Sequence, residues 1–198
     1  MKPLAAAILA AGESRRMGRP KALVSFEGRT FVEHLLAATG HSRIGLVRVV
    51  LGSDAETIGG ELKLSPDAIV VNENWRQGQL SSIQSAIRSL PPGATAGLVL
   101  CPVDHPLITL RLVSQLIAEF DTGKAQIVLP THNGRRGHPV IFRASLYDEL
   151  LSASPDVGAR QVVWAHPEQV AEVPTADAGV ILNLNDAETL KKALGGSA

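Results

Sequence analysis

The feature that most constrains the fold of this chain is a recurring pair of segments, a short apolar run followed by an amphipathic stretch. Most of these runs are apolar at both odd and even positions, which is typical of strands covered on both faces. Strands that alternate with helices predict a mostly parallel sheet with right-handed crossovers, a doubly wound α/β fold. The expected strands are Leu4–Ala10, Leu46–Leu51, Ile69–Val71, Gly97–Cys101 and Ile127–Leu129.

Helix signals lie between the apolar runs. Thr30 and Glu33 have the spacing of a capping box, and Asp54 is placed to cap the next helix. The apolar spacing predicts further helices over Leu80–Leu90 and Leu110–Phe120. Because no linker, repeat or low-complexity segment interrupts the pattern, we expect residues 1–198 to form one domain.

Composition excludes several classes of protein. The 198 residues include 19 basic and 19 acidic side chains, so there is no overall basic field of the kind that nucleic-acid binding requires. No apolar stretch approaches the roughly 20 residues of a membrane span. The Arg15-Arg16 pair follows the first apolar run, whereas an export signal has its charges before that run. Cys101 is the single cysteine, which excludes an intrachain disulfide and favours a reducing, cytoplasmic location.

The loop after the first apolar run has the ingredients of an anion site. Its glycines, Gly12 and Gly18, fit neither the Walker A spacing nor the dinucleotide fingerprint. Glycines nevertheless let backbone N–H groups approach an anion, and Arg and Lys are charge-assisted donors. A solvated basic loop is the alternative, but a position directly after the first strand favours phosphate binding. The cations are Arg15, Arg16, Arg19 and Lys21.

Four other loops are predicted at the same edge, because ligands of such sheets bind beyond the carboxyl ends of the strands. They follow the apolar runs Ile69–Val71, Gly97–Cys101, Ile127–Leu129 and Ile181-Leu182. Asp104 follows a buried strand and could hold Mg²⁺ together with substrate phosphates, or it could simply cap a turn. After the apolar pair Ile181-Leu182, the amides of Asn183 and Asn185 could ligate a metal or accept from a metal-bound water. We interpret Asp186 as the N-cap of the last helix.

Five segments together resemble the molybdenum-cofactor nucleotidyltransferases, in particular their cytidylyltransferase branch. LAAGESRRMGRPKAL is similar to the signature LAAGxSxRMGxxKxL, which many nucleotide-sugar enzymes share. NENWRQGQLSSI, CPVDHPL, GRRGHPVIF with Arg136, and DVGAR at Asp156–Arg160 are similar to further segments of that family. The resemblance covers nearly the whole chain in order.

The resemblance implies a Rossmann-like, three-layer nucleotidyltransferase that uses a nucleoside triphosphate and Mg²⁺. The terminal phosphate of molybdopterin cofactor would attack the α-phosphate, giving a dinucleotide cofactor and pyrophosphate. Such chemistry needs positioning and charge neutralisation more than covalent help. The resemblance also implies a role for each motif residue. The base and ribose would be contacted by Leu9, Ala10, Ala11 and Gly12, and the triphosphate would be held by Arg16 and Lys21. The metal would be faced by Asp104 and Asn185, and the acceptor side would be lined by Asn72, Trp75, Gly78, Ser82 and His138.

Some positions depart from the cytidylyl pattern. Asn185 stands where that branch has a second metal-binding acid, as in the guanylyl branch, whereas Ala11 favours the cytidylyl branch. Gln79 and Ala86 replace a usual methionine and a usual glycine, and both bear on the acceptor. We therefore predict a CTP-dependent enzyme, with a guanylyltransferase or a sugar- or alcohol-phosphate nucleotidyltransferase as alternatives. A non-catalytic chaperone that passes the cofactor to a molybdenum hydroxylase is the alternative from another class.

Overall fold

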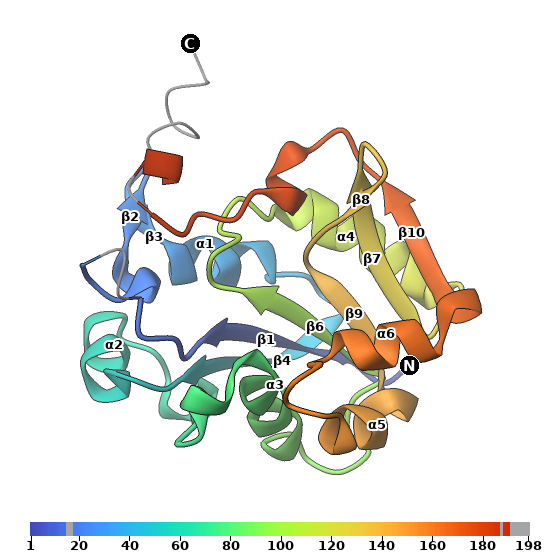
Figure 1. Ribbon diagram of the computed structural model, residues 1–198, viewed down its shortest axis with the longest axis horizontal. Helices are drawn as coiled ribbons and strands as arrows, with labels where there is room; N and C mark the ends of the chain where they lie inside the picture. Colours follow the sequence, from blue (N-terminus) through green and yellow to red (C-terminus); the bar gives the residue numbers. More distant parts are fainter. Residues whose placement is uncertain (15–17, 187, 191–198) are drawn as a thin grey trace.

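A mixed sheet of eight strands forms the centre of the computed structural model, which describes residues 1–14, 18–186 and 188–190 (Figure 1). The order across the sheet is β10-β7-β9-β6-β1-β4-β5, and β8 pairs with β7 at one end. A two-stranded hairpin, β2 and β3, lies apart from it. The strands are β1 (Leu4–Ala10), β2 (Ser25–Phe26), β3 (Arg29–Thr30), β4 (Ile44–Leu51), β5 (Ile69–Val71), β6 (Gly97–Pro102), β7 (Ile127–His132), β8 (Arg135–Arg136), β9 (Val140–Arg143) and β10 (Val170–Pro174).

The five predicted strands are confirmed, and the sheet is mostly parallel as expected. β1 pairs in parallel with β4 and β6, β4 with β5, and β10 with β7. The antiparallel members are β8 and β9, because the chain turns back after β7 through Asn133 and Gly134, both at positive φ. The expectation that Ile181-Leu182 is a further strand end was wrong, since Ala178–Ile181 form a short 3-10 helix, η7.

Helices cover both faces of the sheet, which gives the expected three layers. The alternating residues of β1 divide the core: Leu4, Ala6 and Ile8 pack in one cluster with α1 and α4. Ala5, Ala7 and Leu9 pack in the other with α3, α5 and α6, drawn below the sheet in Figure 1. The helices are α1 (Phe31–Ala38), α2 (Ala55–Glu61), α3 (Gln79–Arg88), α4 (Leu110–Asp121), α5 (Tyr147–Ser152) and α6 (Arg160–Ala165).

Two of the three predicted helix caps are confirmed. The Thr30 hydroxyl accepts from the Glu33 N–H at 3.2 Å, and the Glu33 carboxylate accepts from the Thr30 N–H at 2.7 Å. The Asp186 carboxylate accepts from the Thr189 N–H at 2.7 Å. Asp54 precedes α2 but adopts φ 59°, and within the described residues its side chain makes no capping hydrogen bond. In the part of the chain that the structure describes, no helix combines the length and apolar character needed to cross a bilayer.

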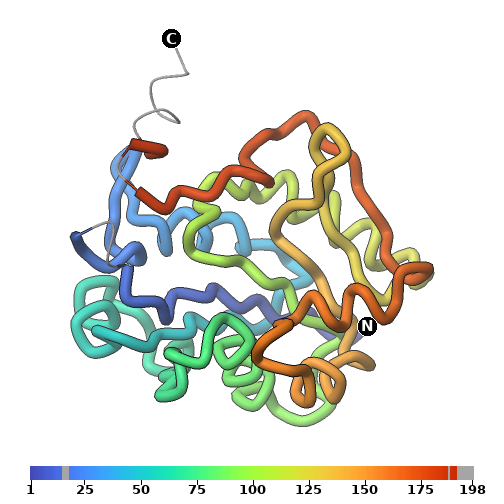
Figure 2. Tube along the Cα trace, viewed as in Figure 1, coloured from blue at the N-terminus to red at the C-terminus, as the bar shows by residue number. Residues whose placement is uncertain are grey.

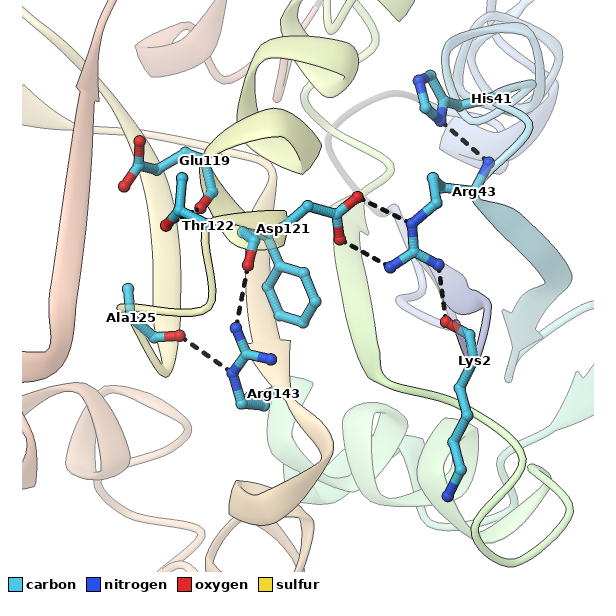
Figure 3. A network of polar contacts seen from close by, with 9 residues as sticks. Lys2, His41, Arg43, Glu119, Asp121, Thr122, Ala125 and Arg143 are labelled. Atoms are coloured by element: carbon cyan, nitrogen blue, oxygen red, sulfur yellow. Dashed lines mark hydrogen bonds and ion pairs between the residues drawn. The ribbon is translucent and has the colours of Figure 1, made fainter.

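An ion-pair cluster joins three segments at the amino ends of β1 and β4 (Figure 3). Arg43 donates to both carboxylate oxygens of Asp121, at 2.9 and 2.7 Å, and to the main-chain carbonyl of Lys2 at 2.7 Å. Arg143 lies over the Phe120 ring, with the guanidinium carbon 4.1 Å from its centroid. The cluster therefore ties the end of α4 to the starts of β1 and β4, at the sheet edge opposite to the loops that were predicted to bind a ligand.

Candidate active site

The carboxyl ends of the central strands meet at one edge of the sheet, and the predicted loops start there. β1, β4, β5 and β6 run in the same direction, so the loops after Ala10, Val71 and Pro102 leave from this edge. β9 runs the opposite way and begins at Val140, which brings the preceding His138 to the same edge. The sheet therefore collects loops that are far apart in the sequence.

Two adjoining hollows open at this edge. The smaller, of about 250 Å³, is lined by the first loop and by the loops after β5 and β6, and we call it the loop hollow. The larger, of about 340 Å³, is lined mainly by apolar side chains together with His138 and residues 155–160, and we call it the apolar hollow. Leu9, Gln79 and Pro102 line both. A ligand in one hollow would therefore lie beside a ligand in the other.

The Lys21 ammonium lies between two side-chain oxygens at the side of the loop hollow. The Lys21 ammonium donates to Asn185 Oδ1 and lies 3.9 Å from Asp104 Oδ2. Lys21 begins the short 3-10 helix η2 (Lys21–Leu23), and its backbone N–H donates to the Ser14 hydroxyl at 2.9 Å. The first loop and the C-terminal segment thus meet at Asp104, as sequence reasoning predicted.

Backbone hydrogen bonds hold Asp104 and Asn185 in place. After β6 the Val103 N–H donates to the Leu9 carbonyl at 3.1 Å, which fixes the start of the turn that carries Asp104. The N–H of Leu184, a fully buried residue, donates to the Asp104 carbonyl at 2.7 Å. Figure 2 shows the red segment that follows η7 crossing the green loop after β6. The Asp104 carboxylate remains 23% exposed, so it faces the loop hollow rather than the core.

The oxygens of Asp104 and Asn185 fit a hard divalent cation. Both contact one cation, the Lys21 ammonium, which stands in for the positive charge that these oxygens attract. Carboxylate and amide oxygens are the ligands that Mg²⁺ takes, with phosphates and water completing its octahedron. Across residues 1–14, 18–186 and 188–190, no cluster of three or more His, Cys, Asp or Glu could hold a metal. Substrate oxygens would therefore have to supply part of the coordination shell.

The buried His105 and the half-buried His138 lie between Asp104 and the apolar hollow. The His105 and His138 rings are 4.7 Å apart between centroids, and His105 Nε2 lies 4.0 Å from Asp104 Oδ1. Burial lowers the pKa of His138 to about 4, with a smaller contribution from His105 and an opposing one from Asp104. Burial likewise lowers the pKa of His105, against the attraction of Asp104. His138 is therefore a neutral imidazole near pH 7.

The structure places the residues that were assigned to the acceptor in different surroundings. Asn72 is 2% exposed; its amide donates to the Ser81 and Ser82 hydroxyls at 2.8 and 3.0 Å and accepts from the Asn74 N–H at 3.0 Å. Asn72 thus organises the loop after β5. His138 lines the apolar hollow, whereas Trp75, Gly78 and Ser82 line the loop hollow beside Lys21.

The residues assigned to nucleotide binding also lie in different surroundings. Leu9, Ala11, Gly12 and Lys21 line the loop hollow, while Ala10 is 4% exposed and packs in the core on the α1 face. Arg16 lies outside the described residues.

Sequence reasoning missed two side chains at this edge. Ser14 supports the Lys21 backbone, and the His105 ring lies between Asp104 and His138, tilted against the His138 ring. Gln79, which the sequence marked only as a departure from the family pattern, lines both hollows. Each of these residues is adjacent to, or within two residues of, a motif residue named above. Proximity in the sequence to a motif residue was therefore the signal that could have pointed to them. Their roles depend on side-chain direction, which the spacing of a motif does not give.

These observations define an α/β enzyme of the nucleotidyltransferase class. A glycine-bearing first loop with a lysine, a carboxylate after a central strand and two adjoining hollows meet at one sheet edge. The family described as "MobA-like NTP transferase domain" matches residues 6–170. The chain belongs to this family, which confirms the resemblance and the expectation of an enzyme that takes a nucleoside triphosphate.

Curated relatives with different names share most of the chain. "Nicotine blue oxidoreductase" of Paenarthrobacter nicotinovorans is 30% identical over 177 residues, 86% of this chain and 86% of that protein. "Probable molybdenum cofactor guanylyltransferase" of Mycobacterium tuberculosis is 27% identical over 190 residues, 95% of this chain and 92% of that protein.

Solved structures confirm the fold. A crystal structure of Rv0371c from Mycobacterium tuberculosis H37Rv superposes with a TM-score of 0.81 at 22% identity, covering 98% of each chain. A second structure of Rv0371c, described as a complex with manganese, has a TM-score of 0.77 at 21% identity and covers 99% of this chain and 100% of that one. The three-layer, Rossmann-like arrangement of this chain is therefore shared with these solved structures.

Proposed function

We propose that this protein transfers CMP from CTP to the terminal phosphate of molybdopterin cofactor, with Mg²⁺, and releases pyrophosphate. An oxygen of the acceptor phosphate forms a bond to the α-phosphorus, and the bond from that phosphorus to the bridging oxygen of the β-phosphate breaks. The observation that carries the proposal is the convergence of Lys21, Asp104 and Asn185 beside two adjoining hollows.

Each described group has a role that its surroundings support. The Lys21 ammonium offers charge-assisted hydrogen bonds to the triphosphate, and the glycine backbone of the first loop can approach it closely. Asp104 and Asn185 would hold Mg²⁺, which neutralises phosphate charge when bound. The acceptor phosphate is already anionic near neutral pH, so the transfer needs no general base on the protein.

The apolar hollow suits a flat acceptor ring with a polar edge. Its walls include Leu80, Ile83 and Phe142, and His138 is placed among them. His138 Nδ1 is buried and has no hydrogen-bond partner among the described residues, so it can pair with a polar atom of the acceptor. A pKa of about 4 keeps this imidazole neutral, which fits a ring edge better than a phosphate.

Ala11 supports CTP as the nucleotide. It lines the loop hollow next to Gly12 and is 5% exposed. A methyl group there leaves less room than a glycine would, and this favours the smaller pyrimidine ring. We expect Ala11→Gly to raise the GTP-to-CTP ratio of kcat/KM by about tenfold, the scale of one methyl group in a binding pocket. An unchanged ratio would mean that Ala11 does not select the base.

The decisive assay incubates purified protein with molybdopterin cofactor, Mg²⁺ and each of CTP, GTP, ATP and UTP, and follows pyrophosphate. We expect pyrophosphate to be released with CTP, and only when the acceptor is present. No release above background with any nucleotide would reject the proposal, and tight cofactor binding in that case would favour the chaperone. Release with sugar phosphates in place of the cofactor would favour the alternative acceptors.

Guanylyl transfer is the second candidate, and specific observations favour it. The relative from Mycobacterium tuberculosis carries a guanylyltransferase name, and this chain has Asn183 and Asn185 in the guanylyl-type ending. Faster turnover with GTP than with CTP would select it. In either case the proposal includes a cytoplasmic enzyme, folded as one domain over residues 1–198, whose product passes to a molybdenum hydroxylase apoenzyme.

A further inference from the structure

The Lys21 ammonium occupies the position between the two oxygens that the proposed function assigns to a metal. Its Nζ donates to Asn185 Oδ1 and lies 3.9 Å from Asp104 Oδ2, and the Lys21 side chain is only 16% exposed. A lysine in contact with both groups satisfies the negative charge of the carboxylate and one lone pair of the amide. These oxygens therefore already have a cation partner that belongs to the chain.

Asp104, Asn185 and the Lys21 ammonium differ in how firmly the surrounding structure holds them. Asp104 lies in a turn fixed by the Leu184 N–H, and Leu184 itself is fully buried next to Asn185. The Lys21 backbone is fixed by Ser14, but its ammonium sits at the end of a flexible four-carbon stem. When a divalent cation approaches these oxygens, the group that can move is the lysine head.

We propose that Lys21 competes with the divalent metal for Asp104 and Asn185, so that metal binds well only when a triphosphate draws the lysine away. This inference rests on the proposed function. An ammonium and a divalent cation cannot share the same oxygens, because like charges at such distances repel strongly in a partly buried site. A triphosphate gives the ammonium another anionic partner, so nucleotide and metal each strengthen the binding of the other.

The first test measures Mn²⁺ binding without nucleotide, by the electron paramagnetic resonance signal of free Mn²⁺. We expect Lys21→Met to bind Mn²⁺ roughly tenfold more tightly than the wild-type protein, the scale of one hydrogen bond to a charged group. Arg19→Met is the matched control, because it removes an exposed cation two residues away. The proposal is overturned if Lys21→Met gains no more Mn²⁺ affinity than Arg19→Met.

The second test uses the wild-type protein and so does not depend on how a variant folds. Acetic anhydride labels exposed amines, and mass spectrometry reports the labelling of each lysine. Saturating Mn²⁺ should release the Lys21 ammonium and raise its labelling at least severalfold, while Lys63 and Lys124, on other loops, serve as internal references. Labelling of Lys21 that stays level or falls as Mn²⁺ is added would count against the competition.

The variant Asp104→Asn separates this inference from the proposed function. Mn²⁺ binding in the presence of CTP should be lost in Asp104→Asn and retained in the wild-type protein. If Mn²⁺ binding with CTP does not depend on Asp104, the metal site fails and the proposed function fails with it. If Mn²⁺ binding depends on Asp104 but not on Lys21, the proposed competition between Lys21 and the metal is wrong, whereas the proposed function stands.

Discussion

Lys21 and Asn185 are joined by a side-chain hydrogen bond although 164 residues separate them. The bond closes the first loop against the segment that follows η7, and Asp104 lies next to both partners. Residues from the start, the middle and the end of the chain are thereby held at one point. A change in any one of the three should alter how the other two meet phosphate or metal.

The first prediction concerns Asp104. We expect Asp104→Ala and Asp104→Asn each to lower the rate of pyrophosphate release about a thousandfold or more, because charge stabilisation in the transition state is a large part of such catalysis. Asp67→Asn, an exposed carboxylate before β5, is the control and should leave the rate unchanged. Near-normal turnover in both Asp104 variants would remove this carboxylate from the site.

Most of the fold was predictable because its signals are local. The strand Leu4–Ala10 and the capping box at Thr30 were predicted with their observed bounds and contacts. The position of β9 between β6 and β7 was not predicted, because strand order depends on packing between distant segments. The pair Ile181-Leu182 has the apolar character of a strand end, yet Ile181 is the last residue of η7, which Asp177 caps by accepting from the Gly179 N–H at 2.8 Å.

The site was predictable as a set of loops but not as a set of contacts. Parallel strands bring their carboxyl ends to one edge, so Lys21 and Asp104 could be expected near each other. The sequence does not show which way a side chain points. Asn72 therefore proved to be a buried loop anchor, while Trp75 lines the loop hollow rather than the apolar hollow with His138.

A second prediction concerns the stability that Asn72 provides. Its buried amide makes three hydrogen bonds, to Ser81, Ser82 and the Asn74 backbone. Replacing it with alanine leaves buried polar partners unsatisfied, so we expect Asn72→Ala to lower the free energy of unfolding by about 2–4 kcal/mol. Urea denaturation followed by circular dichroism measures this. A loss below about 0.5 kcal/mol would contradict the anchoring role.

Asn74→Ala is the matched control for this experiment. The Asn74 side chain accepts from Gln77 at 3.5 Å, at an exposed position. Its backbone N–H, which bonds to Asn72, is retained in the variant. We therefore expect a change within about 0.5 kcal/mol, as for most exposed substitutions.

A third prediction follows from the low pKa of His138. The folded state holds this group at a pKa of about 4, against 6.5 for the ordinary imidazole, so the unfolded chain binds the proton more readily between these values. Stability is therefore lost as the pH falls from about 6.5 to 4, by up to about 3 kcal/mol from this group. Thermal unfolding of His138→Gln over this range should show a shallower decline than the wild-type protein. A decline in His138→Gln as steep as that of the wild-type protein would contradict this prediction.

The last prediction concerns the ion pair between Asp121 and Arg43, shown in Figure 3. Hydrogen bonds from Arg43 hold the pKa of Asp121 below its ordinary value of 3.8. The pair therefore contributes its full stability above about pH 4 and loses it as the pH falls through the lowered pKa.

We expect Asp121→Asn to lower the free energy of unfolding at pH 7 by about 1 kcal/mol, since the pair is partly exposed but bidentate. The difference between the two proteins should shrink below about pH 4, where the wild-type carboxylate protonates. Glu119→Gln, two residues earlier on α4, is the control and should lower the free energy of unfolding at pH 7 by less than Asp121→Asn does. A constant gap between Asp121→Asn and the wild-type protein from pH 7 to pH 3 would show that Arg43 is held there by something other than charge.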